Sequence, residues 1–326
     1  MQSLDLLEAY RRMYLIRHVE EEIVRHYPEG KMRTPVHLSI GQESAAVGVM
    51  MALQPDDHVY STHRCHAHYL AKGGDLDAMI AEFYGKATGC AGGWGGSMHL
   101  IDEKVGFMGT SAIVGSSIAL AVGSALAFKL SGSGQVAVAF FGDAALETGV
   151  LYEAINFAAL HELPILFVCE NNLYSTATPL KQRQPQRLFS HVAKAMGLRA
   201  AHSIPDHGYG NVESVYRVAK ELLKFLPAYM EIETYRFREH VGPNYDWDLG
   251  YRSKQEVEAR EKLDPVRHLW DQLCTRDGYS LGGIEIQIQA RVAEAFEKAE
   301  AAPWPGKTWT EAAPWPDMVL RADKIS

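Results

Sequence analysis

The chain of 326 residues is 47% apolar and 22% charged, with a formal net charge of −8. A chain of this size and composition can bury a large core, as one α/β domain or two smaller ones. The negative charge argues against a general binder of nucleic acid or of anionic membranes. Four scattered cysteines without C-x-x-C spacing argue against a zinc ribbon or a disulfide framework. This cysteine pattern fits a reducing cytoplasm, where we expect the protein to be located. There is no signal-peptide pattern and no run of about 18 apolar residues.

The first part of the chain combines amphipathic helices with one short strand. Apolar residues at helical spacing predict helices over 4–27, 41–53 and 76–84, and a strand is expected over 57–61. A glycine-dense loop is expected over 85–109.

The middle of the chain alternates helices with buried strands. The Gly-, Ser- and Ala-rich stretch over 110–128 is predicted to be a packed helix. Continuous apolar runs predict strands over 136–141 and 164–169, which a helix over 147–161 separates. A strand, helix and strand within about 35 residues indicate two parallel strands with a right-handed crossover.

The last part predicts a helix over 212–225, a strand over 229–236 and charged helices over 254–302. The whole pattern indicates an α/β fold, a mostly parallel sheet with helices on both faces. We expect a single domain over 1–326, in which 254–326 is a helical and irregular C-terminal extension.

Two polar residues follow the two buried strands. Asp143 and Asn172 come directly after the strands expected over 136–141 and 164–169. Ligands of open α/β sheets bind beyond the carboxyl ends of the strands, and a helix that begins there offers free N–H groups to an anion. Carboxylate and amide oxygens beside a diphosphate would form an all-oxygen shell for Mg²⁺ or Ca²⁺. Taken alone, Gly142-Asp143 or Asn171-Asn172 could instead be an ordinary turn at the end of a strand.

The combined pattern is more specific than either turn. Gly142 and Asp143 open a segment that closes on Asn171 and Asn172, and it resembles the thiamine-diphosphate motif. The third position of that motif is usually glycine, and here it is Ala144.

Further segments resemble the α subunits of 2-oxo-acid dehydrogenase E1 components, in the order of that family across roughly residues 5–270. They are HLSIGQE from His37, HRCH from His63, GGSMH from Gly95, IVG from Ile113, and Tyr235-Arg236 followed by His240. The segment from His63 to Gly73 is most similar to the acetoin and pyruvate dehydrogenase branch. The resemblance therefore implies the thiamine-diphosphate-binding fold.

The resemblance implies a role for each matching residue. Mg²⁺ would be bound by Asp143, Asn172 and the carbonyl of Tyr174, and catalytic roles would fall to His240 and His66. The other residues implied to contact thiamine diphosphate are His63, Arg64, Ala112, Val114, Gly142, Ala144 and Ala145, with Asp143, Asn172, Tyr174 and His240 contributing as well.

The implied function is that of an E1 α subunit. It would cleave a 2-oxo acid or acetoin with thiamine diphosphate and Mg²⁺, and pass the acyl group to a lipoyl-bearing E2 protein. An E1 β subunit would complete the active site in an α2β2 heterotetramer. Two alternatives stay open at this stage: a carboligase or ketol transferase without a lipoyl step, and a non-catalytic homologue. Ala144, Trp94 and the loop that follows His240 leave room for the first alternative, and Ala144 alone supports the second.

Three other features have competing interpretations. His63, Cys65, His66 and His68 could form a zinc site, although their spacing does not place three ligands on one helical face. The glycines over 92–96 lack the Lys-Ser/Thr of a P-loop and are expected to let two backbones approach closely. Trp304, Trp309 and Trp315 could anchor a partner or pack on the parent domain.

Overall fold

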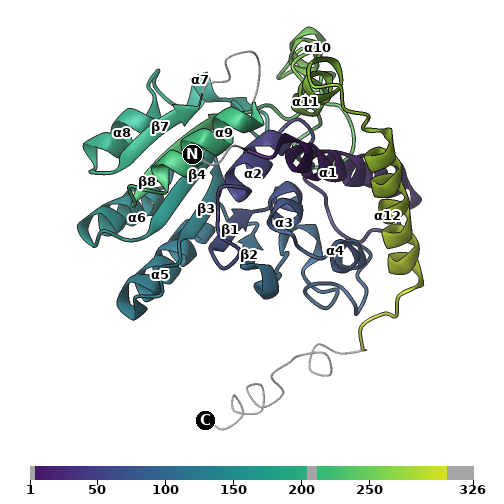
Figure 1. The fold of residues 1–326 in the computed structure, drawn as a ribbon, viewed down its shortest axis with the longest axis horizontal. Helices are drawn as coiled ribbons and strands as arrows, with labels where there is room; N and C mark the ends of the chain where they lie inside the picture. The colour runs from purple at the N-terminus through teal and green to yellow at the C-terminus, as the bar shows by residue number, and fades with distance from the viewer. Residues whose placement is uncertain (1–3, 204–210, 307–326) are drawn as a thin grey trace.

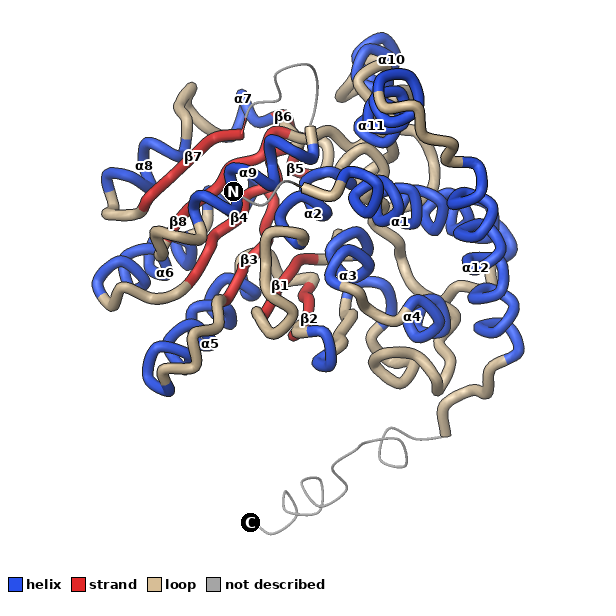
Figure 2. Tube along the Cα trace, in the orientation of Figure 1, coloured by secondary structure: helices blue, strands red, loops and turns tan. Residues whose placement is uncertain are grey.

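The computed structural model describes residues 4–203 and 211–306, and its centre is a six-stranded sheet with strand order β2-β1-β3-β4-β8-β7 (Figures 1 and 2). All five pairings are parallel. The strands are β1 (His58–Thr62), β2 (Phe107–Ser111), β3 (Ala137–Gly142), β4 (Ile165–Asn171), β7 (Arg199–Ser203) and β8 (Ala228–Glu233). A separate antiparallel pair joins β5 (Tyr174–Ser175) to β6 (Thr178–Pro179). The predicted α/β class with a parallel sheet is confirmed.

The helices form a layer on each side of this sheet. On one side lie α5 (Ser116–Ser131), α6 (Gly149–Leu160) and α8 (Phe189–Ala195). On the other lie α1 (Leu6–His26), α2 (Glu43–Met50), α3 (His66–Lys72), α4 (Leu76–Phe83), α9 (Val212–Leu222), α10 (Lys254–Glu261), α11 (Pro265–Asp271) and α12 (Gly282–Ala301). A short helix, α7 (Leu180–Arg183), follows β6.

The side chains of β3 point alternately to the two faces of the sheet, which explains why both faces are covered by helices. Ala137, Ala139 and Phe141 pack into the core with α5 and α6, whereas Val138 and Phe140 pack into the core with α1, α2 and α3. Successive side chains of a strand point to opposite faces, so a strand that is apolar at every position needs a helical layer on each side.

The order of the strands reverses between β1 and β3. From β1 the chain adds β2 on one side, and β3 and β4 then continue on the other. The loops at the carboxyl ends of β1 and β3 consequently diverge, which is where open α/β sheets bind their ligands.

The N-terminal helix shows how local signals set the boundaries of an element. The Asp5 carboxylate accepts hydrogen bonds from the N–H groups of Leu7 and Glu8, which satisfies donors that the first turn of α1 leaves free. The helix continues into a short 3₁₀ turn that ends at Gly30, whose φ of 69° lies in the left-handed region. The prediction over 4–27 is confirmed.

Several sequence predictions differ from the structure. Residues 107–111 form β2, so the helix predicted over 110–128 begins only at Ser116. The strand predicted over 229–236 ends at Glu233. The helical prediction over 254–302, by contrast, is confirmed: this stretch forms three helices and a π-helical segment over Gln272–Arg276. No pattern in the sequence predicted α3, α7, α8 or β5 to β7.

The C-terminal helices share a core with the N-terminal ones. Val257, Leu269 and Phe296 are buried in the same cluster as α1 and α4. Trp304 lies over the side chains of Arg33 and Lys86, with Lys86 Nζ 4.0 Å from the ring centroid, so it packs on the parent domain. Trp309 and Trp315 lie outside the described residues. Within 4–203 and 211–306, no helix has both the length and the apolarity that a membrane crossing requires.

Candidate functional site

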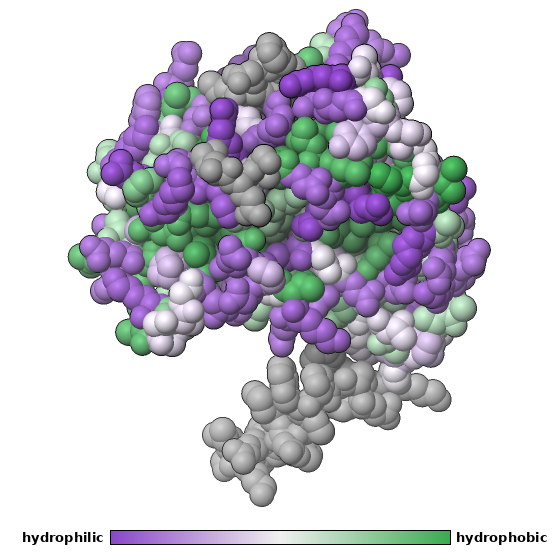
Figure 3. Space-filling view, viewed as in Figure 1, coloured by the Kyte–Doolittle hydropathy of each residue, from purple (hydrophilic) through white to green (hydrophobic). Residues whose placement is uncertain are grey.

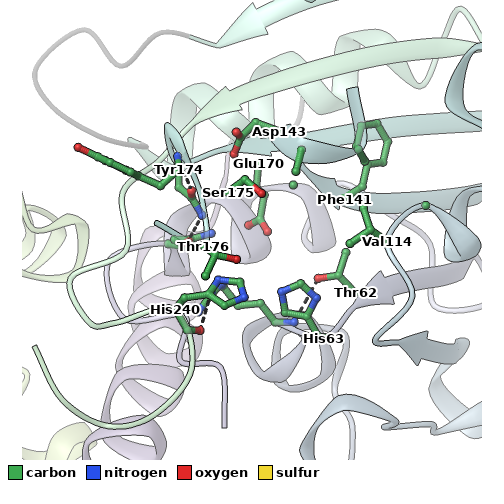
Figure 4. A pocket seen from close by; sticks show the side chains of 17 residues that line it. Thr62, His63, Val114, Phe141, Asp143, Glu170, Tyr174, Ser175, Thr176 and His240 are labelled. Carbon is green, nitrogen blue, oxygen red and sulfur yellow. Dashed lines mark hydrogen bonds between the residues drawn. The ribbon is translucent and has the colours of Figure 1, made fainter. Parts of the chain in front are cut away.

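A pocket lies at the carboxyl ends of β1, β3 and β4, at the point where the strand order reverses. Figure 4 shows Asp143 at one end of the pocket, His63 and His240 side by side at the other, and Glu170 between them. Most predicted cofactor residues line it: His63, Arg64, Val114, Gly142, Asp143, Ala144, Ala145, Asn172, Tyr174 and His240. Segments that are far apart in the sequence therefore meet at one site.

Asp143 is a buried carboxylate at the end of β3. Its side chain forms an ion pair with Arg183, and that guanidinium also contacts Glu147. Burial raises the pKa of the Asp143 carboxyl, and the charge of Arg183 partly opposes the increase. A metal ion at Asp143 must displace Arg183, which would still be held by Glu147 and by the carbonyl of Thr178, 3.2 Å from its Nε.

Asn172 follows β4 and lies in the same pocket. Its Oδ1 accepts the N–H of Tyr174 at 3.2 Å, and its Nδ2 donates to Gln42 Oε1 at 3.3 Å. Leu173, between two predicted metal ligands, has a φ of 72°, which is strained for a side-chain-bearing residue. The donor set of one carboxylate and one amide oxygen fits Mg²⁺.

Gly142 leaves space beside these oxygens. Its backbone is extended, so the turn itself does not require glycine. A Cβ at this position would meet no protein atom within 4 Å, and the residue lines the pocket. A ligand can therefore approach the backbone here, as a diphosphate would need. The 3₁₀ helix over Asp143–Glu147 begins at the same place, with Ala144 and Ala145 on the pocket lining.

Arg64 supplies a buried cation at the other end of the pocket. Its guanidinium donates to the carbonyls of Leu38 at 2.6 Å and His240 at 3.0 Å. Burial, together with the smaller effect of the charge of Arg236, lowers the pKa of Arg64 to about 9. At pH 7 Arg64 is therefore a cation within reach of an anionic ligand.

The segment that carries His240 has no helix or strand of its own. It is held by Asp246, which is fully buried and pairs with both Arg236 and Arg252. Arg236 Nη1 lies 3.0 Å from Asp246 Oδ2, and Arg252 Nε lies 2.6 Å from Oδ1. Both guanidiniums also donate to the carbonyl of Arg238, at 2.7 and 2.9 Å. This buried network fixes the backbone just before His240.

Three histidine rings meet beside Arg64. The ring centroids of His37 and His63 are 4.6 Å apart, those of His37 and His240 are 5.2 Å apart, and those of His63 and His240 are 5.4 Å apart. Burial, followed by the charge of Arg64, lowers the pKa of His37 to about 2, of His63 to about 4 and of His240 to about 3. All three imidazoles are neutral at pH 7.

Two predicted site residues do not line the pocket. His66 is fully buried, its Nδ1 lies 2.8 Å from Glu20 Oε1, and its ring packs on Phe83. The catalytic role predicted for His66 is corrected on this ground, because the side chain is turned away from the cavity into the layer of α1 and α4. Ala112 lies on an exposed segment between β2 and α5 rather than on the pocket wall.

The zinc interpretation of His63, Cys65, His66 and His68 is not supported. Cys65 donates to the carbonyl of Ser97, and His68 Nδ1 lies 2.8 Å from Ser61 Oγ, so the four side chains point to different partners. Across the described parts of the chain, the group of His, Cys or acidic side chains close enough to share an ion is His37, His63 and His240.

The backbone of the glycine-rich segment over 92–96 binds the carboxylate of Glu82. Glu82 is buried, and its two oxygens accept N–H groups from Ala91, Gly93, Gly95 and Gly96 at 2.7–2.9 Å. A Cβ at Gly93 would lie 2.6 Å from the carbonyl oxygen of Lys86. The expectation that these glycines permit a close backbone approach is confirmed.

Sequence reasoning missed four residues of the pocket region. His37 opens a recognised motif but was assigned no role there, and its buried Nδ1 has no hydrogen-bond partner among the residues that the structure describes. Gln42 belongs to the same motif, and Glu170 directly precedes Asn171 at the end of β4. Arg183 comes from α7, for which the sequence carries no helical signal.

Comparison with known proteins identifies the family. The chain matches the family described as "Dehydrogenase E1 component" over residues 11–307. It belongs to the dehydrogenase E1 component family. The α subunit of the acetoin:2,6-dichlorophenolindophenol oxidoreductase of Bacillus subtilis is 36% identical over 310 residues, which cover 92% of this chain and 90% of the relative. The pyruvate dehydrogenase E1 α subunit of Zymomonas mobilis is also 36% identical, over 92% of this chain and 86% of the relative.

A third relative covers the same span. The pyruvate dehydrogenase E1 α subunit of Rickettsia bellii is 32% identical over 93% of each chain. These matches confirm the family resemblance drawn from the sequence, the E1 fold and the class of oxidoreductase enzymes. They favour a dehydrogenase over the carboligase and non-catalytic alternatives.

Proposed function

We propose that this chain is the α subunit of a thiamine-diphosphate- and Mg²⁺-dependent E1 enzyme that acts on a 2-oxo acid or on acetoin. The observation that carries the proposal is the pocket at the switch point of the sheet, with Asp143 and Asn172 at one end and Arg64 and His240 at the other. An oxygen-ligated cation and a buried guanidinium are complementary to a diphosphate from two sides.

In this mechanism the residues of the chain bind and orient the cofactor. Asp143, Asn172 and the Tyr174 carbonyl would hold Mg²⁺, and the backbone N–H groups of Ala144 and Ala145 would bind diphosphate oxygens. When bound, thiamine diphosphate supplies the carbanion that attacks the substrate carbonyl and the ring that accepts the electrons of the cleaved bond.

The two ends of the pocket have different tasks. Arg64 would neutralise diphosphate charge, since its guanidinium stays protonated at pH 7. His240 is neutral, so it can accept a proton or donate a hydrogen bond near the reacting group. The Asp246 network would hold His240 in that position. The acyl group would then pass to a lipoyl-bearing E2 protein.

A partner β subunit is implied by the α-subunit names of the relatives, and we propose an α2β2 assembly. The chain has an exposed face suited to such a partner. On α5, Leu120 and Leu130 are 59% and 79% exposed, and on α6, Leu160 is 73% exposed. In Figure 3, hydrophobic side chains appear at the edge of the molecule that α5 and α6 form. Large apolar side chains that are exposed on two neighbouring helices are available for contact with a partner subunit.

Val114 connects this face with the pocket. It lines the pocket and is 49% exposed, and the adjacent Ile113 is 74% exposed. A subunit docked on α5 would therefore also cover the open side of the site, which explains why the chain alone would be inactive. A cytoplasmic location is part of the same proposal.

The proposal is tested by reconstitution. The chain, a β subunit of the same family and their mixture are assayed for dye reduction that depends on pyruvate or acetoin, with thiamine diphosphate and Mg²⁺. Activity is expected only in the mixture. Full activity of the chain alone would contradict the two-subunit proposal, and absence of activity in a stable mixture with both substrates would contradict the substrate class.

A further inference from the structure

The histidine cluster at the inner end of the pocket has the ligand chemistry of a second kind of metal site. The candidate ligand atoms of His37, His63 and His240 all lie within 4.8 Å of one another. His37 is 7% exposed, and within 4–203 and 211–306 its Nδ1 finds no hydrogen-bond partner. A buried polar atom without a partner carries a free-energy cost, which coordination of an ion through Nδ1 would remove.

From this geometry we propose that His37, His63 and His240 form a binding site for a borderline divalent cation such as Zn²⁺, separate from the oxygen-lined end of the pocket, and that occupancy blocks the pocket. Imidazole nitrogens suit Zn²⁺, Cu²⁺ and Ni²⁺, whereas Mg²⁺ and Ca²⁺ require oxygen ligands. Three protein nitrogens would leave a fourth coordination position for water or for an oxygen of another ligand.

The side chains need only a small movement to coordinate an ion. With Zn–N bonds of about 2.0–2.1 Å in a tetrahedral shell, ligand nitrogens lie about 3.3 Å apart. Starting from at most 4.8 Å, each nitrogen would move inward by about 0.8 Å. His63 and His240 are only partly buried, so rotation of these two rings is sterically possible.

Arg64 is the feature that opposes a cation here. Its Nη2 lies 3.3 Å from His240 Nδ1, and its positive charge contributes to the lowered pKa values. Two observations offset this repulsion. The guanidinium is already bound to the carbonyls of Leu38 and His240, so it loses little if the Nδ1 contact breaks. The Glu170 carboxylate lies between the two ends of the same cavity and supplies a compensating negative charge (Figure 4).

An ion at this site would change what the pocket can do. His63 and His240 both line the pocket, and His240 lies on a segment without regular secondary structure. Coordination would tie that segment to His37 and His63, and it would take the lone pairs that the site otherwise presents to a ligand. The expected consequence is reversible inhibition, and this consequence alone depends on the proposed function.

Binding is tested on the full chain alone, with Zn²⁺ as the probe and competition against a chromophoric chelator. We expect one equivalent to bind with a dissociation constant on the order of 1 μM or tighter. His63→Phe and His37→Gln should each weaken binding at least about tenfold. Two controls, His191→Gln at an exposed histidine on α8 and Asp143→Asn at the oxygen-lined end, should leave the affinity unchanged. The urea midpoint of each variant verifies that it is folded.

Co²⁺ reports which atoms coordinate. A site of imidazoles gives ligand-field bands without the thiolate charge-transfer band that coordination by Cys65 would produce. In the complex with a β subunit, micromolar Zn²⁺ should inhibit activity and a chelator should restore it. The proposal is overturned if Zn²⁺ binds less than one equivalent, if either histidine variant retains the wild-type affinity, or if a thiolate band appears. None of these outcomes depends on whether the complex is an E1 enzyme.

Discussion

The buried Asp246 network offers the sharpest test of how this fold positions His240. The perturbation is Asp246→Asn, which keeps the shape of the side chain and removes its charge. Asp246 is fully buried and is the carboxylate shared by Arg236 and Arg252, which are themselves 0% and 4% exposed. Tyr251 also donates its hydroxyl hydrogen to this carboxylate.

The expected magnitude follows from what the substitution leaves behind. Two buried guanidiniums would lose their shared counter-charge, and the new amide N–H₂ group would face donors. Removal of one partner from a buried ion pair costs about 3–5 kcal/mol. Part of this loss is expected to appear as local opening of residues 234–252 rather than as global unfolding, because this segment has no helix or strand to hold it.

Two measurements separate the global destabilisation by Asp246→Asn from the local one. Urea unfolding gives the global change, and hydrogen exchange gives the local opening of residues 234–252. The matched control is Asp248→Asn, which removes an equal charge at an exposed position two residues away and should change stability by less than about 0.5 kcal/mol. If Asp246→Asn matched this control in both measurements, the network would not be what holds His240.

Three further predictions test other parts of the account. His63 has a folded-state pKa of about 4, below its unfolded value of about 6.5, so the stability it contributes is complete above pH 6.5 and is lost as the pH falls toward 4. In His63→Gln, the loss of unfolding free energy in urea between pH 7 and pH 5 should be smaller by about 2 kcal/mol, and an unchanged loss would refute the burial of a neutral imidazole. Leu120→Asp should abolish association with a β subunit in size-exclusion chromatography while the urea midpoint of the chain alone is unchanged; retained association would exclude α5 from the interface. Gly41→Ala should destabilise the chain by about 2–4 kcal/mol in urea, because Gly41 has a φ of 97° and a Cβ there would lie 2.4 Å from the Tyr235 carbonyl oxygen; a wild-type midpoint would contradict this backbone geometry.

The sequence predicted the sheet and the oxygen-lined end of the site because both depend on local patterns. The apolar runs before Asp143 and Asn172 identify strands that are buried on both faces, and strand ends on one edge bring their following residues together. Asp143 and Asn172 indeed line one pocket.

The missed features depend on contacts across the chain. Arg183 reaches Asp143 from a four-residue helix that has no periodic signal. His37 meets His240 only because the segment after β8 folds back over the loop before α2, where the N–H of Phe237 donates to the carbonyl of Ile40. His66 was assigned by its position in a motif, and the helical turn of α3 points it toward Glu20 instead.

The central claim, that Asp143 anchors a Mg²⁺-bound diphosphate, is tested most directly by calorimetry of thiamine diphosphate binding to the complex of this chain with a β subunit. With wild-type chain, binding should require Mg²⁺ and should be lost with excess chelator. With Asp143→Asn, which replaces a charged ligand by a neutral one at a cost of about 1.5–3 kcal/mol, affinity should fall about 10- to 150-fold. Binding that is independent of Mg²⁺, or an Asp143→Asn complex with wild-type affinity, would contradict the account.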